Sequence, residues 1–500
     1  MAAVLVFTVF ALVAVGVLAG VHWYLWRRLV RDTTAPRGAA RRAGTAAAFV
    51  FPLLSLGALV SGRAGAPFWL QRTLAWPGYL WIALLLYLTL AVLAGEAARP
   101  LLRRALARRA APAAPGPAAP AMTGGTRSTA DAGPASDGTL SARAHAGEAG
   151  PLGDPAGEPR GAKAVTGTRR AADTSPDRVP TVTGDEPGRD GSTSAGEAAG
   201  LATPAAAGPD SADRTAGDEA GPGGSDVSRR LFVSRAVAGA AVAVAAGTVG
   251  YGTYGVMRGP RVKRVTVPLA KLPRAAHGFR IAVVSDIHLG PILGRAHTQR
   301  IVDTVNATQP DLVAVVGDLV DGSVPDLGPA AEPLARLRAR HGSYFVTGNH
   351  EYFSGAAQWV DHVRELGLHP LENDRVEIGG FDLAGVNDIA GEREGDGPDF
   401  VRALGDRDRS RAAVLLAHQP VVVHDAVRHG VDLQLSGHTH GGQLWPGNYL
   451  AELANPTVAG LERYGDTQLY VTRGAGAWGP PVRVGAESDI TVVQLASKQV

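Results

Sequence analysis

The chain has no cysteine among its 500 residues, so it can neither form a disulfide nor bind a metal ion through a thiolate. Its net charge is only +3, and it has no basic stripe with interleaved aromatics, which argues against a nucleic-acid partner. Residues 110–227 contain no Phe, Tyr, Trp or Ile. Such a segment cannot bury enough apolar surface to offset its ordering entropy. We therefore expect 110–227 to be a disordered linker rich in Pro, Gly and Ala.

Three long apolar runs occupy the first part of the chain, at 2–26, 44–60 and 74–93. The first and third are long enough to cross a hydrocarbon core of ~30 Å. Arginines follow both runs, namely Arg27, Arg28, Arg31, Arg37, Arg41 and Arg42 after the first, and Arg99, Arg103, Arg104, Arg108 and Arg109 after the third. Under the positive-inside rule these flanks predict a membrane region at 1–109 with about three transmembrane helices and an external N-terminus. The alternatives are a signal peptide for the first run and buried core helices for all three.

A further apolar run follows the linker, at 228–257. It begins with Arg229 and Arg230, has Phe232 two positions on, and continues as a mildly apolar Ala/Gly/Val-rich stretch. This pattern resembles a twin-arginine export signal, which would make the export machinery a partner. The alternative is an ordinary fourth transmembrane helix. Both interpretations place Arg229 and Arg230 inside and the chain after about Tyr254 outside, so we expect a multi-pass protein of the cell membrane with its C-terminal domain extracytoplasmic.

Residues 262–500 have the sequence pattern of a compact α/β domain. Short β-rich runs alternate with segments of helical spacing at 296–308, 329–340, 355–366 and 421–428. Later β-rich runs at 381–386, 469–472 and 490–495 have fewer helices between them, which suggests a second sheet.

Metal-ligand side chains directly follow five of the apolar strand runs. They are Asp286 and His288, Asp318, Asn349, His418, and His438 and His440. Sites in open α/β sheets form beyond the carboxyl ends of the strands, so we expect these seven side chains to converge. Carboxylate, amide and imidazole ligands suit Mn²⁺, Fe and Zn²⁺.

The order D-x-H, G-D, G-N-H-E, H, G-H-x-H resembles the calcineurin-like metallophosphoesterase superfamily, over about residues 265–497. The spellings GNHEY and GHTHGGQ look like its membrane-associated or exported bacterial branch. The resemblance implies a two-sheet α/β sandwich holding two divalent ions, Mn²⁺, Fe²⁺/³⁺ or Zn²⁺. By resemblance, one ion is bound by Asp286, His288 and His440, the other by Asn349, His418 and His438, and both by the bridging Asp318. A bridging water, as hydroxide, is then the expected nucleophile.

His350 follows a ligand but is not expected to be one. The resemblance makes it the residue that protonates the leaving oxygen or stabilises charge on the phosphoryl group, a role that suits the pKa of histidine. Glu351 either orients His350 or is an exposed acidic residue. Asp321 either supports the ligands or has no part in the site.

Two further pairs of residues are weaker candidates. Arg473 or Arg483 holds a phosphate oxygen, or both are solvated arginines of a surface turn. Trp445 and Trp478 contact a lipid or the membrane surface, or pack as ordinary aromatics.

These observations predict a membrane-anchored, metal-dependent phosphoric ester hydrolase acting on a phosphomono- or phosphodiester. A lipid or cell-envelope phosphoester is favoured because the anchor holds the site near the bilayer. The alternatives are a nucleotide or nucleic-acid phosphodiesterase, and a non-catalytic membrane scaffold with a structural metal site.

Overall fold

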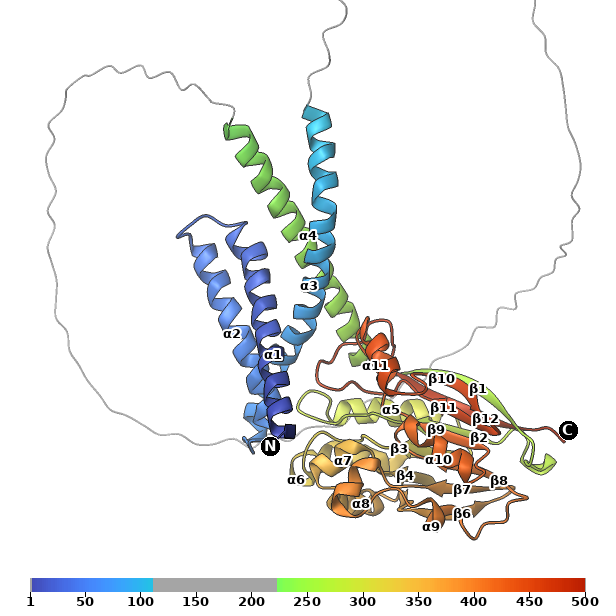
Figure 1. The fold of residues 1–500 in the computed structure, drawn as a ribbon. Helices are drawn as coiled ribbons and strands as arrows, with labels where there is room; N and C mark the ends of the chain where they lie inside the picture. The colour runs from blue at the N-terminus through green and yellow to red at the C-terminus, as the bar shows by residue number, and fades with distance from the viewer. Residues whose placement is uncertain (1, 111–222, 500) are drawn as a thin grey trace, which may run out of the picture. The chain divides into compact units, whose positions relative to one another are not determined.

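The apolar runs of the second half of the chain form two six-stranded β-sheets that pack face to face (Figure 1). The computed structural model describes residues 2–110 and 223–499. The predicted linker, 110–227, therefore lies almost wholly outside the described residues. The α/β sandwich expected for this half of the chain is confirmed.

The first sheet has the order β1-β12-β2-β3-β4-β5. Its strands are β1 (Arg261–Leu269), β2 (Arg280–Val284), β3 (Leu312–Val316), β4 (Ser343–Val346), β5 (His369–Pro370) and β12 (Asp489–Ser497). Strands β2 to β5 are parallel to one another, β12 is antiparallel to β2, and β1 is parallel to β12.

The second sheet has the order β10-β11-β9-β8-β7-β6. Its strands are β6 (Asp374–Ile378), β7 (Phe381–Gly385), β8 (Ala412–Leu416), β9 (Leu433–Ser436), β10 (Gly460–Tyr464) and β11 (Thr467–Val471). Strands β7, β8, β9 and β11 are parallel, and the two edge strands are antiparallel to their neighbours.

Alternation along the strands divides the apolar side chains between two layers of core. In β2, Ile281 and Val283 enter the cluster between the two sheets, whereas Ala282 and Val284 enter the cluster on the outer face of the first sheet. Helices α5 (Arg295–Ala307), α6 (Val324–Ala331) and α8 (Ala356–Glu365) cover that outer face. Helices α9 (Phe400–Leu404) and α10 (Val423–Arg428) cover the second sheet. The remaining helices of this half are α7 (Asn349–Ser354) and α11 (Gly447–Ala454).

Two sequence-based expectations about this half of the chain are wrong in detail. The helix expected at 329–340 ends early, because α6 stops at Ala331 and a 3₁₀ segment follows to Arg336. The run at 490–495 lies in β12 of the first sheet, not in the second. A long loop connects β11 to β12, and a strand after a long loop can join either sheet. The spacing along the sequence therefore did not determine to which sheet β12 belongs.

Four long helices come before the first strand of the sandwich in the sequence. They are α1 (Ala2–Leu25), α2 (Ala39–Ser61), α3 (Phe68–Ala110) and α4 (Gly223–Met257). Among the described residues, three stretches are long and apolar enough to cross a membrane, namely Ala39–Ser61, Phe68–Ala105 and Arg230–Met257. α1 is a further apolar helix of 24 residues.

Polar contacts join these helices at their arginine-rich ends. Arg28 Nε, just after α1, lies 3.1 Å from Glu96 Oε1 of α3. Arg235 of α4 donates to the carbonyl of Thr33, which follows α1. The arginine-rich ends of α1, α3 and α4 therefore lie on the same side of the helix group.

The other parts of these helices contact the sandwich. The Tyr87 hydroxyl of α3 donates to the carbonyl of Trp445 at 3.0 Å, and Val482 shares a buried cluster with Tyr87 and Val249. Only three residues, 258–260, separate α4 from β1. Glu487 lies 2.6 Å from Arg261 and 3.7 Å from Arg258, so ion pairs span this short junction.

Candidate metal centre

Five of the seven expected ligands have a backbone conformation that L-residues rarely adopt. φ is 53° at Asp286, 49° at His288, 52° at Asp318, 73° at His438 and 53° at His440. A non-glycine residue in this left-handed region costs about 1–3 kcal/mol and persists only where its surroundings hold it. Backbone strain of this kind is concentrated at functional sites. Its presence in the loops after β2, β3 and β9 therefore indicates that these loops form a functional site.

Glycines let these loops approach one another closely. A Cβ at Gly348 would collide with the Asp318 carboxylate, and a Cβ at Gly437 would collide with Ser285 and Asp286. These collisions explain why glycine precedes Asn349 and His438 in the two most specific motifs.

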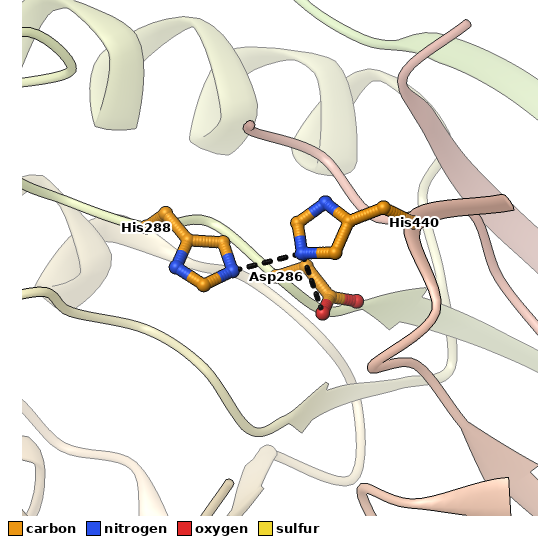
Figure 2. Close-up of side chains that lie close together, drawn as sticks. All are labelled: Asp286, His288 and His440. Carbon is orange, nitrogen blue, oxygen red and sulfur yellow. Dashed lines mark hydrogen bonds and ion pairs between the residues drawn. The ribbon is translucent and has the colours of Figure 1, made fainter. Parts of the chain in front are cut away.

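Asp286, His288 and His440 form the first group of donors (Figure 2). His288 Nε2 lies 3.0 Å from His440 Nε2, and His440 Nε2 lies 3.3 Å from Asp286 Oδ1. All three residues are buried, with exposed fractions of 0%, 2% and 7%. Two imidazole nitrogens and a carboxylate oxygen that converge in a buried position are an arrangement that a divalent cation stabilises.

Asp318, His418 and His438 form the second group. His418 Nε2 lies 3.1 Å from Asp318 Oδ2, and His438 Nδ1 lies 3.0 Å from Asn349 Oδ1. Asp318 Oδ2 is also 3.7 Å from His288 Nε2 of the first group. The Asp318 carboxylate thus lies between the two groups, where a bridging ligand is expected. All seven predicted ligands are brought together.

In His418 and His288, the hydrogen bond made by Nδ1 determines that Nε2 is the nitrogen free to bind a cation. His418 Nδ1 lies 2.9 Å from the carbonyl oxygen of Val316, which only accepts, so Nδ1 carries the proton. His288 Nδ1 lies 2.9 Å from Asp321 Oδ1 in the same way. In each neutral ring Nε2, which lies on the side of Asp318, is therefore the nitrogen that can bind a cation. Metal-binding histidines are commonly held like this, so the donor set fits divalent cations.

His440 has a different partner on its outer nitrogen. The guanidinium of Arg483 lies 3.0 Å from His440 Nδ1, and an arginine only donates. In the neutral ring the proton therefore sits on Nε2. Burial, then the charge of Arg483, holds the pKa of His440 well below its ordinary value. Binding of a cation at Nε2 accordingly requires this ring to give up that proton.

Asp321 links a predicted ligand to His350. Asp321 Oδ1 lies 2.9 Å from His288 Nδ1 and 2.7 Å from His350 Nδ1. Burial opposes ionisation of Asp321, but the two histidines outweigh it and lower its pKa to about 2. Burial likewise opposes protonation of His288, yet Asp321, Asp318 and Asp286 raise its pKa to about 9. The sequence left open whether Asp321 has a part in the site. The structure shows that it contacts both His288 and His350.

Glu351 is completely buried, and the expectation that it orients His350 or lies exposed is wrong. Its carboxylate accepts backbone N–H bonds from Asp318 at 2.9 Å, Leu319 at 2.7 Å, Val320 at 3.3 Å and Gly348 at 2.6 Å. Burial raises its pKa to about 7, and the nearby Asp318 charge acts in the same direction. Its role is to hold the loop that presents Asp318.

Arg483 is not a solvated surface residue. It is 5% exposed and donates to the carbonyl oxygens of His440, Arg473 and Gly476 beneath the first donor group. Trp478 is 55% exposed and its ring centre lies 5.7 Å from that of His350, so it flanks the site. Trp445 is 50% exposed.

Known proteins resemble this half of the chain. A family model described as calcineurin-like phosphoesterase matches residues 279–442. A Danio rerio protein named "Transmembrane protein with metallophosphoesterase domain" is 40% identical over 259 residues, which cover 49% of this chain and 59% of that protein. An uncharacterized metallophosphoesterase of Aquifex aeolicus is 34% identical over 243 residues, covering 48% of this chain and 92% of that protein.

A third relative, the uncharacterized metallophosphoesterase YkuE of Bacillus subtilis, is 30% identical over 288 residues, covering 54% of this chain and 98% of that protein. The chain spans less than two thirds of the length of the fish relative but nearly all of the two bacterial ones. With the two-sheet sandwich and the converging donor groups, these matches show that the chain belongs to the calcineurin-like metallophosphoesterase family.

Proposed function

We propose that this protein is a membrane-anchored, metal-dependent phosphoesterase that hydrolyses phosphomono- or phosphodiesters. The observation that supports this most directly is the convergence of Asp286, His288 and His440 with Asp318, His418 and His438 in two buried groups. Asp286, His288 and His440 would hold one divalent ion, and Asn349, His418 and His438 the other, with Asp318 between them. Two bound cations supply Lewis acidity toward phosphate oxygens and acidify water.

Asp321 and His350 are placed to supply a proton to the leaving group. Asp321 Oδ1 accepts the Nδ1 proton of His350 at 2.7 Å, so Nε2 is the nitrogen left to donate a proton. We assign to His350 Nε2 the protonation of the leaving oxygen. The backbone N–H of His350 donates to Asp318 Oδ1 at 2.9 Å, which ties its position to the predicted bridging carboxylate.

We also propose that the sandwich lies on the outer face of the membrane. Support comes from the common side of the arginine-rich helix ends, because basic flanks face the cytoplasm and the sandwich contacts the other parts of these helices. In this proposal the segment 228–257, with Arg229 and Arg230 near its start, is either a twin-arginine export signal or a fourth transmembrane helix.

Hydrolysis of mono- and bis-p-nitrophenyl phosphate by the detergent-solubilised chain with Mn²⁺ tests the catalytic proposal. We expect metal-dependent release of p-nitrophenol from at least one of the two. A folded, metal-loaded protein that turns over neither compound would contradict the enzyme and favour a structural metal site.

A further inference from the structure

A cavity of about 410 Å³ adjoins the candidate metal centre. One side is lined by His288, Asp321 and His350. The opposite side comes from residues 58–79, which are the last turn of α2, the α2–α3 connection and the start of α3. We call residues 58–79 the hairpin wall. The site of the sandwich is thus completed by a segment that lies more than two hundred residues earlier in the sequence.

The hairpin wall is seated on the sandwich at two places. Phe68 packs against the apolar cluster on the outer face of the first sheet. At the other place, a Cβ added at Gly479 would lie 3.8 Å from Cε1 of Tyr79, so the Tyr79 ring covers the loop that carries Trp478. The wall is therefore part of the same packed unit as the donor groups.

The hairpin wall brings one positive charge, that of Arg63, to this cavity, and the sandwich lines the cavity with the carboxylates of Asp321 and Asp326. Arg63 lines it, and its one hydrogen bond among the described residues goes to the carbonyl of Leu59 at 3.3 Å. No carboxylate of the described residues lies within ion-pair distance of Arg63. A cation that lines the same cavity as the proposed phosphoester site is suited to hold an anionic oxygen of that substrate.

Apolar groups surround this charge. Leu59 and Phe68 line the cavity from the wall, and Phe353 and Trp478 line it from the sandwich. The rings of Phe353 and Trp478 stand 5.6 and 5.7 Å from the ring of His350. A small polar phosphoester would leave these groups in contact with water, whereas a substrate with a hydrocarbon part would cover them.

The position of the wall indicates where that hydrocarbon part comes from. Leu59 belongs to the candidate span Ala39–Ser61, and the neighbouring span begins at Phe68. Trp69 and Trp76 of that second span are 68% and 38% exposed. Exposed tryptophans near the end of a span are typical of the membrane–water interface, so on the proposed membrane anchor the cavity would lie at the level of lipid head groups.

We propose that this cavity binds the phosphoester of a lipid-soluble alcohol, with Arg63 holding an anionic oxygen of the substrate and Leu59 contacting its hydrocarbon chain. The proposal rests on the phosphoesterase function proposed above and names its substrate class. Leu59 lies in the last turn of α2, and Arg63, just after the helix, donates to the Leu59 carbonyl, so the wall presents the apolar and the charged contact side by side.

The test uses p-nitrophenyl alkyl phosphates, from the methyl to the octyl ester, with the full chain in detergent and Mn²⁺. These esters share the reacting group and differ only in the chain. For the wild type we expect kcat/KM to rise by up to about fourfold per added methylene while the chain still finds apolar surface. Leu59→Asn should lower kcat/KM for the octyl ester ~10-fold and leave the methyl ester unchanged. Leu56→Asn is the control, because Leu56 is an exposed residue of the same helix that does not line the cavity.

Arg63→Gln should raise KM about 10-fold for every ester, with kcat and metal content unchanged. Arg63→Lys should recover part of the loss, and Arg72→Gln, outside the cavity, should change nothing. Calorimetric binding of octylphosphonate to the metal-loaded protein gives a readout without turnover. Equal octylphosphonate affinity in wild type, Leu59→Asn and Arg63→Gln overturns the proposal. If the methyl ester is hydrolysed in that case, the phosphoesterase function stands without this substrate class. If neither these diesters nor p-nitrophenyl phosphate is hydrolysed but the affinities differ as expected, only the phosphoesterase function fails.

Discussion

The buried carboxylate of Glu351 accepts the backbone N–H of Asp318 at 2.9 Å and so fixes the loop that presents the predicted bridging ligand. Glu351→Gln replaces one accepting oxygen by an N–H₂ group that faces donors. Hydrogen bonds to a charged group contribute about 1.5–3 kcal/mol each, so we expect a loss of stability of at least that size and weaker metal binding. Denaturant unfolding and metal titration measure both. Glu365→Gln, at a side chain 76% exposed, is the matched control and should behave as wild type.

Asp318→Asn should lose both metal ions, because a neutral amide cannot serve two cations in place of the carboxylate between the donor groups. Metal analysis of the purified protein gives the answer directly. Asp361→Asn, whose side chain is 73% exposed, should retain the wild-type content. Two ions per chain in Asp318→Asn would remove Asp318 from the bridging position.

His350→Ala should keep both metal ions and slow the reaction by ~10²–10⁴-fold for substrates with a poor leaving group. The loss should be much smaller with p-nitrophenolate, which leaves without protonation. Comparing an alkyl and an aryl leaving group in the same variant therefore isolates proton donation. Equal losses for the two would assign His350 to binding of the phosphoryl group instead.

We expect the buried His297 to make folding stability depend on pH. Burial, helped by Arg300 and Arg483, lowers its pKa from 6.5 to about 3, and neither ring nitrogen has a hydrogen-bond partner among the described residues. Between these values the unfolded chain binds a proton that the folded chain does not. Stability should therefore fall as pH drops below about 6.5, by about 1.4 kcal/mol per pH unit.

His297→Phe should remove this part of the pH dependence. Unfolding measured at pH 7 and pH 5 should show about 2 kcal/mol less acid destabilisation in the variant than in the wild type. His424→Phe, at an exposed position, should retain the wild-type dependence. Because metal release by acid affects all three proteins alike, the difference between them reports on His297 alone. Parallel curves for all three would contradict the shift.

The absence of cysteine makes the topology directly testable. Ser410→Cys lies at an exposed position of the sandwich, and Ala35→Cys lies at an exposed position between α1 and α2. In intact cells a membrane-impermeant maleimide should label Ser410→Cys and should label Ala35→Cys only after the membrane is opened. The reverse pattern would place the sandwich in the cytoplasm.

The donor groups could be predicted because their loops follow continuous apolar strands. Each of β2, β3, β8 and β9 is buried on both faces, so its end is visible in the sequence as the point where polar ligands begin. The first edge strand, β1, was missed because Arg261, Lys263 and Arg264 interrupt its apolar pattern. Edge strands commonly have such charges, which hide them from a search for apolar runs.

Two parts of the site could not be read from the sequence. The burial of Glu351 depends on where four backbone N–H groups from two loops converge, and sequence does not record that. The hairpin wall depends on which face of a membrane helix meets the sandwich. Arg63 and His350 are distant in sequence, and no local pattern links them. Motifs identified the reacting groups, whereas packing determined what supports and encloses them.

The junction at 258–260 keeps the candidate metal centre close to α4, its proposed membrane anchor. Three residues span at most about 10 Å when fully extended, and the ion pairs of Glu487 with Arg258 and Arg261 leave little of that as slack. An enzyme on a long tether samples the surrounding solution, but a domain attached this closely stays in the plane of its anchor. On the proposed membrane anchor its encounters with a lipid substrate would be two-dimensional, and its rate would follow the number of substrate molecules per area of membrane, not their concentration in the bulk.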